Sequence, residues 1–197
     1  MDNIPLYDKY AKAYASNTNQ KILQFQLNKF ISMLKKKAKI LDVGCGCGRD
    51  AEYFKSEGFS VTGIDLSEGM LNEAKNKAKD VELLKMDMRK LELKKNTFNG
   101  IWCMASLLEI PKNEVGIVLK EFNKVLKKEG VLYISTKEGG GEQFLKKEIY
   151  ENEPKFYAFY KQTELEDLLK ENGFEILYSI VSEDEGTKWV EIFAKKI

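Results

Sequence analysis

Short runs rich in β-branched and other apolar residues alternate with longer segments in which apolar residues recur at helical spacing. Five runs of the first kind are predicted as strands: Lys39–Val43, Ser60–Asp65, Val81–Met86, Gly100–Met104 and Val131–Thr136. Segments with helical spacing lie before the first strand and between later ones: Lys21–Lys36, Asp50–Glu57, Glu68–Ala78 and Val115–Leu126. This alternation is typical of βαβ units and predicts a mainly parallel sheet, with the last of these helices covering one face of it.

The end of the chain has a different pattern. A helix predicted at Glu164–Asn172 stops at Gly173, and two strands follow at Glu175–Ser182 and Lys188–Ala194. Residues 183–186 between them are few enough to form a hairpin turn, so these two strands should be antiparallel. The sequence therefore predicts an α/β fold whose parallel sheet ends in an antiparallel hairpin.

Size and charge limit the classes of function. A chain of 197 residues that is 43% hydrophobic can bury one substantial core, so one domain is expected over residues 1–197. The 32 Lys and Arg residues nearly balance the 31 Asp and Glu residues, which gives no support to nucleic-acid binding. The N-terminus does not resemble a signal peptide and no long apolar run is present, so a cytoplasmic protein without membrane association is expected.

The cysteines favour neither a disulfide framework nor a metal site. Cys45 and Cys47 are separated by one residue in a glycine-rich stretch, and Cys103 is the third cysteine. A zinc site would need all three thiolates and a carboxylate, because the chain has no histidine, and the paired CxxC spacing is absent. No metal is predicted, and thiol catalysis is disfavoured because no base accompanies these residues.

A glycine-rich turn between a strand and a helix is the clearest chemical signal. Gly44, Gly46 and Gly48 follow the first predicted strand, and they let a ligand approach the backbone closely. Asp65 comes 21 residues after Gly44 at the end of the second strand, where a carboxylate can accept the hydroxyl groups of a ribose. Asp50 lies where the next helix begins, and both an N-capping role and a cofactor contact are open for it.

The turn fits one nucleotide cofactor better than another. A dinucleotide site has the pattern GxGxxG, whereas here Arg49 occupies the position of the third glycine. Asp42 would repel a pyrophosphate, but it suits the ammonium and sulfonium groups of S-adenosylmethionine. Asp87 and Met88 end the third strand, where they could contact an adenine, and alternation predicts that only one of Met86 and Met88 points into the pocket. A nicotinamide-dependent oxidoreductase stays open on the fold alone.

Successive segments of the chain resemble the motifs of class I S-adenosylmethionine-dependent methyltransferases: ILDVGCGCGRD, GIDLSEGML, MDMRKL, FNGIWCMASLLEIP and KKEGVLYIS. The resemblance implies a Rossmann-like three-layer sandwich with a seven-stranded, mostly parallel sheet and an antiparallel C-terminal hairpin. It also implies S-adenosylmethionine as the cofactor. Residues 1–36 would form a leading helix and a helical lid over that cofactor.

The same resemblance implies a set of cofactor-binding residues. The methionine part would be surrounded by Asp42, Gly44, Cys45 and Gly46, with Asp50 as a further candidate, and the ribose would be bound by Asp65. The adenine would be enclosed by Leu66, Met70, Asp87 and Met88. The remaining contacts would come from Met104 and Ala105 after the fourth strand and from Tyr7 and Tyr14 in the lid.

Glu109 departs from the family pattern, because relatives often carry a histidine in the stretch after the fourth strand. We expect Glu109 to serve as a general base or to hold a cationic acceptor. Tyr157 and Tyr160 are the other candidates for taking a proton from the acceptor.

Residues 138–162 follow the fifth strand and are expected to form an insertion that covers the substrate. Lys137 and Glu138, at the end of that strand, are candidate binding partners for the acceptor. The expected reaction is in-line transfer of a methyl group to a small molecule, which requires alignment and exclusion of water more than elaborate catalytic groups. A non-catalytic protein that binds S-adenosylmethionine is the remaining alternative.

Overall fold

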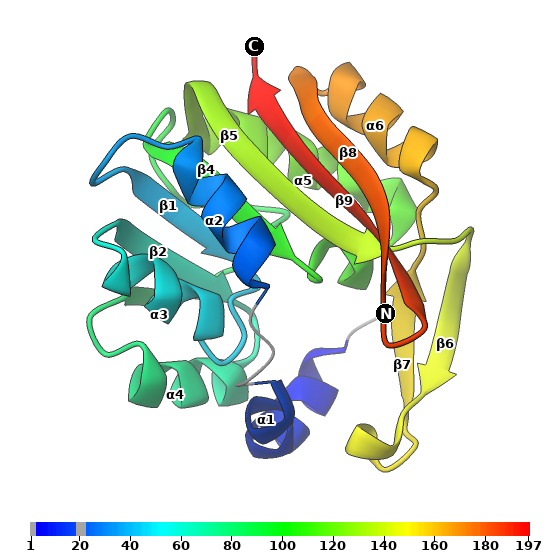
Figure 1. The fold of residues 1–197 in the computed structure, drawn as a ribbon. Coiled ribbons are helices and arrows are strands. Elements are labelled where there is room, and N and C mark those ends of the chain that lie inside the picture. Colours follow the sequence, from blue (N-terminus) through cyan, green and yellow to red (C-terminus); the bar gives the residue numbers. More distant parts are fainter. Residues whose placement is uncertain (1–2, 19–22) are drawn as a thin grey trace.

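The computed structural model describes residues 3–18 and 23–197 and contains a seven-stranded sheet with the strand order β3-β2-β1-β4-β5-β9-β8 (Figure 1). The strands of this sheet are β1 (Lys39–Val43), β2 (Ser60–Asp65), β3 (Glu82–Lys85), β4 (Phe98–Met104), β5 (Leu126–Lys137), β8 (Phe174–Asp184) and β9 (Thr187–Lys196). β1 to β5 pair in parallel, whereas β9 is antiparallel to both β5 and β8. The predicted fold class and the C-terminal hairpin are confirmed.

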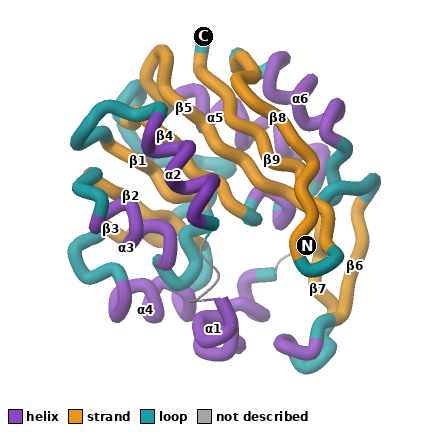
Figure 2. Tube along the Cα trace, viewed as in Figure 1, coloured by secondary structure: helices purple, strands orange, loops and turns teal. Residues whose placement is uncertain are grey.

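Helices lie on both sides of the sheet (Figure 2). They are α2 (Gln24–Ser32), α3 (Arg49–Ser56), α4 (Glu68–Lys77), α5 (Val115–Val125) and α6 (Gln162–Glu171), with α1 (Ile4–Thr18) at the beginning of the chain. The predicted helix start at Lys21 lies outside the described residues, and α2 is described from Gln24 onward.

Two hydrophobic cores cover the two faces of the sheet. On one face, Phe30 of α2 and Phe54 of α3 contact Trp102 of β4 with ring centroids 5.3 and 5.4 Å away. On the other face, α5 buries an apolar stripe that includes Val118 and Phe122, as predicted from their helical spacing. These two cores pack the helices against the two faces of the sheet, which makes the fold a three-layer sandwich.

One hairpin was not predicted. β6 (Glu142–Lys146) and β7 (Pro154–Ala158) pair with each other as a separate two-stranded antiparallel sheet. The 3-10 turn η3 (Glu148–Tyr150) connects them. β7 is almost completely buried and β6 is largely exposed, so neither strand shows the polar and apolar alternation by which strands are recognised in a sequence.

Helix α1 lies beyond the carboxyl ends of the parallel strands, beside the β6–β7 hairpin (Figure 1). The Asp8 carboxylate accepts hydrogen bonds from Ser67 Oγ (2.6 Å) and Gly69 N (2.9 Å) at the start of α4. On another side of the helix, Leu6 and Tyr10 form a small apolar cluster with Tyr150 of η3. α1 thus has a polar contact on one side and an apolar contact on another, and Tyr7 OH also donates a hydrogen bond to Glu109.

None of the helices in the described residues is both long and apolar enough to span a bilayer.

Candidate functional site

The loops after β1 and β4 approach each other so closely that one of them requires a glycine. Gly44 has a φ of +68°, and a Cβ added there would lie 2.4 Å from the Cβ of Ser106. Ser106 Oγ donates a hydrogen bond of 2.7 Å to Val43 O, while Gly44 N and Cys45 N both donate to Ile64 O. Gly44 therefore lies where the ends of three strands meet, and there is no space for a side chain at this position. Nothing in the sequence singled out Ser106.

The backbone holds the Asp65 carboxylate in place at the end of β2. Its Oδ2 accepts from Gly46 N and its Oδ1 from Ser67 N, both at 2.9 Å. Burial raises the pKa of Asp65, and these backbone hydrogen bonds partly oppose the rise. Asp65 is therefore a carboxylate of fixed orientation on the wall of a cavity.

Asp42 carries a buried oxygen that lacks a partner. Its exposed fraction is 3%, and its Oδ2 has no hydrogen-bond partner among the residues that the structure describes. Burial raises the pKa of Asp42 well above its usual range, and the neighbouring charges of Asp50 and Asp65 raise it further. Because an unpaired buried carboxylate is costly, this position suits a cationic ligand group.

Asp50 does not cap the helix in which it lies. The N-cap of α3 is Gly48, with no side-chain hydrogen bond, so the N-capping interpretation of Asp50 is wrong. The Asp50 carboxylate instead accepts from Trp102 Nε1 (2.9 Å) and from Arg49 Nε (2.7 Å) and Nη2 (3.0 Å). Arg49 and Asp50 thus form a largely buried ion pair beside the glycine turn.

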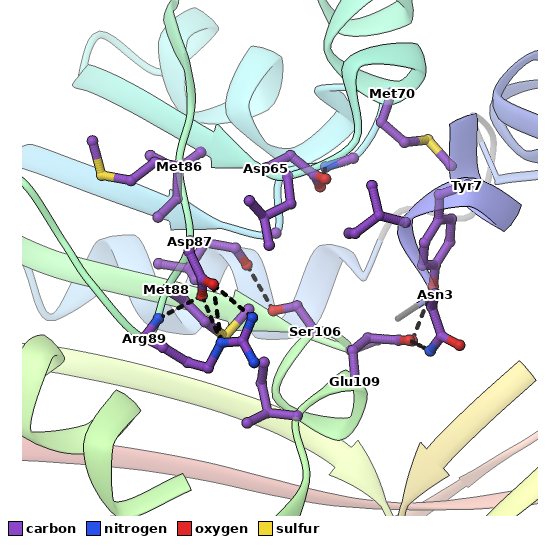
Figure 3. A pocket seen from close by; sticks show the side chains of 18 of the residues that line it. Asn3, Tyr7, Asp65, Met70, Met86, Asp87, Met88, Arg89, Ser106 and Glu109 are labelled. Atoms are coloured by element: carbon purple, nitrogen blue, oxygen red, sulfur yellow. Dashed lines mark hydrogen bonds and ion pairs between the residues drawn. The ribbon is translucent and has the colours of Figure 1, made fainter. Parts of the chain in front are cut away.

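Two adjoining cavities open at the carboxyl ends of the strands, with volumes of about 120 and 550 Å³. Eleven of the fourteen predicted cofactor residues line the first cavity: Tyr7, Tyr14, Gly44, Gly46, Asp65, Leu66, Met70, Asp87, Met88, Met104 and Ala105. Figure 3 labels five of them: Tyr7, Asp65, Met70, Asp87 and Met88. The other three, Asp42, Cys45 and Asp50, line the second cavity. All fourteen therefore lie in the walls of one connected region, because several residues line both cavities.

The lining of the first cavity differs from the prediction at Met86 and Met88, and it includes Arg89, which was not predicted. Met86 and Met88 both line it, contrary to the prediction. Residues two positions apart in extended backbone lie on the same face, so alternation gives no reason to separate them. Arg89 contacts both oxygens of Asp87 and also donates to Glu114 at 2.7 Å. Partial burial favours the neutral form of Asp87, but the Arg89 hydrogen bonds outweigh it and lower the pKa. The sequence did not indicate this pairing.

Glu109, in the 3-10 turn η1 (Leu107–Glu109), lies where both cavities meet. It accepts hydrogen bonds from Tyr7 OH (2.9 Å), from Lys155 Nζ (2.5 Å) and from Asn3 Nδ2. Glu109 therefore forms its ion pair with Lys155 of the protein itself, and its role towards an acceptor stays a prediction. Burial raises the pKa of Tyr7, and the Glu109 charge raises it further.

The two tyrosine candidates have different surroundings. Tyr157 lines the second cavity, and burial, together with the Glu109 charge, raises its pKa. Tyr160 is 0% exposed, belongs to the larger hydrophobic core and lines neither cavity. Tyr160 is therefore too remote from both cavities to receive a proton from an acceptor.

All three cysteines are buried as free thiols. Burial raises the pKa of Cys45 well above its usual range and that of Cys103 to about 12, so both thiols are protonated at neutral pH. Among residues 3–18 and 23–197, no group of three or more His, Cys, Asp or Glu side chains is arranged to hold a metal ion.

Comparison with known proteins agrees with this geometry. A family profile described as a methyltransferase domain matches residues 40–130. The putative methyltransferase YqeM of Bacillus subtilis is 38% identical over 104 residues, which cover 50% of this chain and 42% of that protein. The ubiquinone/menaquinone biosynthesis C-methyltransferase UbiE of Campylobacter jejuni is 28% identical over 148 residues, which cover 70% of this chain and 62% of that protein.

Similarity to solved structures extends over most of the chain. The crystal structure of an S-adenosylmethionine-dependent methyltransferase from Methanosarcina mazei superposes with a TM-score of 0.78 at 25% identity, covering 84% of this chain and 95% of that one. The chain spans about half the length of the curated relatives named above. In its sequence motifs, its strand order and the profile that matches residues 40–130, this chain is similar to class I S-adenosylmethionine-dependent methyltransferases.

Proposed function

We propose that this chain transfers the methyl group of S-adenosylmethionine to a small-molecule acceptor by in-line displacement. The observation that carries the proposal is the unpartnered Oδ2 of Asp42, buried beside the glycine turn. An ammonium group at this position would remove the cost of a buried carboxylate without a cation, whereas a pyrophosphate would increase it. This difference favours S-adenosylmethionine over a nicotinamide dinucleotide.

The residues along the cavities fit the parts of that cofactor. Gly44 and Gly46 leave room for the methionine part next to Asp42, and Asp65 would accept hydrogen bonds from the ribose hydroxyls. The adenine would lie among apolar side chains of the first cavity, including Met70 and Met88. When bound, the cofactor would supply an electrophilic methyl group on a sulfonium centre.

The protein's part in such a transfer is to align the reactants and to exclude water. Tyr7 and Tyr14 of α1 line both cavities and would cover the methyl group, as a lid within residues 1–36. Residues 138–162 contribute Lys147, Lys155 and Tyr157 to the second cavity and would cover the acceptor. Glu109 and Tyr157 remain the candidates for holding a proton of the acceptor, since both line that cavity.

Isothermal titration with S-adenosylhomocysteine tests the proposal. We expect binding to the wild-type protein and a loss of at least about tenfold in affinity for Asp65→Ala, because two hydroxyl hydrogen bonds to a charged acceptor are removed. Asp80→Ala, which changes an exposed aspartate outside both cavities, should bind like the wild type. Binding of NADH in place of S-adenosylhomocysteine, or of neither, would overturn the proposal.

A second measurement separates an enzyme from a non-catalytic binding protein. Turnover of S-adenosylmethionine is followed across a panel of small carboxylates, phenols, amines and thiols. Methylation of at least one of them supports the enzyme. Tight cofactor binding with no turnover across the panel would favour the non-catalytic alternative.

A further inference from the structure

Three lysine side chains from different strands meet at one aromatic ring in the second cavity. Lys155 of β7, Lys137 at the end of β5 and Lys147 after β6 place their Nζ atoms 3.9, 4.6 and 5.5 Å from the ring centroid of Tyr157. All four residues line this cavity. Ammonium groups at such distances from a ring are attracted to its face, but they also repel one another.

The cluster contains more positive than negative charge. Glu109 forms an ion pair with Lys155, whereas no ion pair joins Lys137 or Lys147 to a carboxylate in the described part of the chain. Lys137 is only 9% exposed. Burial lowers its pKa to about 8, and the charges of Lys147 and Lys155 contribute to the same shift. A buried ammonium with two cationic neighbours is costly unless an anion joins it.

Carboxylates elsewhere in this cavity do not neutralise the cluster. Asp50 is paired with Arg49, and Glu191 accepts a hydrogen bond from Tyr133 in the core. Residues 183–185 are acidic and line the cavity from the exposed turn between β8 and β9, where water screens their charge. The second cavity therefore has an acidic part at the glycine turn and a basic part at Tyr157.

We propose that the methyl acceptor is an anion whose carboxylate or phosphate group binds to the ammonium groups of Lys137 and Lys147, beside Tyr157. This inference rests on the proposed function, since it assigns the basic part of the second cavity to the acceptor. Lys155, held by Glu109, would fix the position of the Tyr157 ring and add to the positive potential. A planar acceptor would gain a second contact by stacking on that ring.

The test uses benzoate and phenyl phosphate as anionic probes and benzamide as a neutral probe of the same shape as benzoate. Each is titrated by ligand-detected NMR into the full chain, with and without saturating S-adenosylhomocysteine. The variants are Lys137→Gln and Lys147→Gln. The matched control is Lys146→Gln, an exposed neighbour of Lys147 that lines neither cavity.

We expect at least one anionic probe to bind about tenfold or more tightly than benzamide, as one charge-assisted contact provides. Lys137→Gln and Lys147→Gln should each weaken that probe about tenfold, whereas Lys146→Gln should not. Comparison of benzoate with phenyl phosphate shows which anion the site prefers. Equal binding of benzamide, or binding of neither anion, would overturn the inference.

Two further outcomes separate this inference from the proposed function. If both lysine substitutions weaken S-adenosylhomocysteine and leave the probes unchanged, the lysines belong to the carboxylate of the cofactor, and the inference fails while the proposed function stands. If S-adenosylhomocysteine binds to no form of the protein, the proposed function fails and the assignment of an acceptor falls with it. Titration of the probes without S-adenosylhomocysteine then shows whether the anion site exists by itself.

Discussion

Asp42 shows how one buried side chain can link cofactor binding to pH. Burial, and then the charges of Asp50 and Asp65, raise its pKa, while the Arg49 charge and a hydrogen bond from the Ala51 backbone act in the opposite direction. In the free protein the neutral form of Asp42 is therefore favoured up to a higher pH than in an ordinary aspartate. A ligand ammonium placed beside it favours the ionised form and lowers the pKa again.

Binding of S-adenosylhomocysteine should accordingly release a proton from Asp42, and the affinity should fall as the pH is lowered through the pKa of the free protein. Isothermal titration in buffers with different ionisation enthalpies measures this release as a dependence of the heat on the buffer. Asp42→Asn, which cannot titrate, should bind more weakly and release no proton. A heat that is the same in every buffer for the wild type would contradict this prediction.

Three aspartates of the site that the sequence predicted share one property, which is their position at the end of a predicted strand. Asp42, Asp65 and Asp87 belong to this class, because parallel strands direct their carboxyl ends to one edge of a sheet. Arg89 and Lys155 were missed, because their roles depend on partners that become neighbours only in the folded chain. Tyr160 was wrongly included, because a position within the insertion does not decide whether a ring faces the cavity or the core.

At the scale of elements, the contact between Glu109 and Lys155 connects parts that are distant in sequence. Glu109 belongs to η1, Lys155 to β7 and Tyr7 to α1, and the carboxylate of Glu109 contacts the other two. The side chain of Lys155 is 3% exposed and that of Glu109 is 15% exposed. Burial lowers the pKa of Lys155, and the Glu109 charge opposes this shift. The charged form of Lys155 is therefore stabilised at this buried position by Glu109.

Glu109→Gln should destabilise the protein by about 3–5 kcal/mol, because it leaves Lys155 as an unpaired buried cation. Glu109→Gln combined with Lys155→Met should recover most of that loss, since it removes the isolated charge. Glu114→Gln is the matched control: its pair with Arg89 is exposed by about a third and should contribute about 1 kcal/mol or less. Urea unfolding measures all three, and equal losses for Glu109→Gln and Glu114→Gln would contradict the prediction.

Elements were predicted well where burial is regular and poorly where it is not. The bounds of β1 and β2 agree with the sequence pattern, because both strands are buried in the middle of the sheet. β5 begins at Leu126 rather than Val131, because Leu126 pairs with Phe98 of β4 before a register shift. Glu129, with a φ of +63°, lies between the two paired segments. The β6–β7 hairpin lacks such regularity, and tertiary contacts hold it: Phe156 of β7 belongs to the larger hydrophobic core, and its backbone N donates a hydrogen bond to Asn3 Oδ1.

At the scale of the whole molecule, α1 is attached largely by interactions near the surface, apart from the hydrogen bond from Tyr7 to Glu109. Its described contacts include the Asp8 hydrogen bonds at the start of α4, hydrogen bonds from Tyr10 and Lys9 to Glu153, and the small cluster around Tyr150. Most of these are partly exposed to solvent, where each contributes little. We therefore expect α1 to open more readily than the rest of the protein.

Hydrogen exchange followed by mass spectrometry tests this expectation. Saturating S-adenosylhomocysteine should slow amide exchange in Ile4–Thr18, because Tyr7 and Tyr14 line the first cavity and would contact the bound ligand. The control is Gln162–Glu171, a helix that lines neither cavity and should exchange at the same rate in both states. Exchange in α1 that is unchanged by the ligand would show that the helix is not a lid.

The wall shared by the two cavities at Tyr7 and Glu109 also has a kinetic consequence. Occupation of the first cavity alters the surface that an acceptor meets in the second, so the two reactants cannot bind independently. Steady-state turnover should then follow a compulsory order, in which the methyl donor enters first and the demethylated product leaves last. In that order, the product competes with the donor for the free enzyme and inhibits non-competitively towards the acceptor, and steady-state product inhibition measures this pattern.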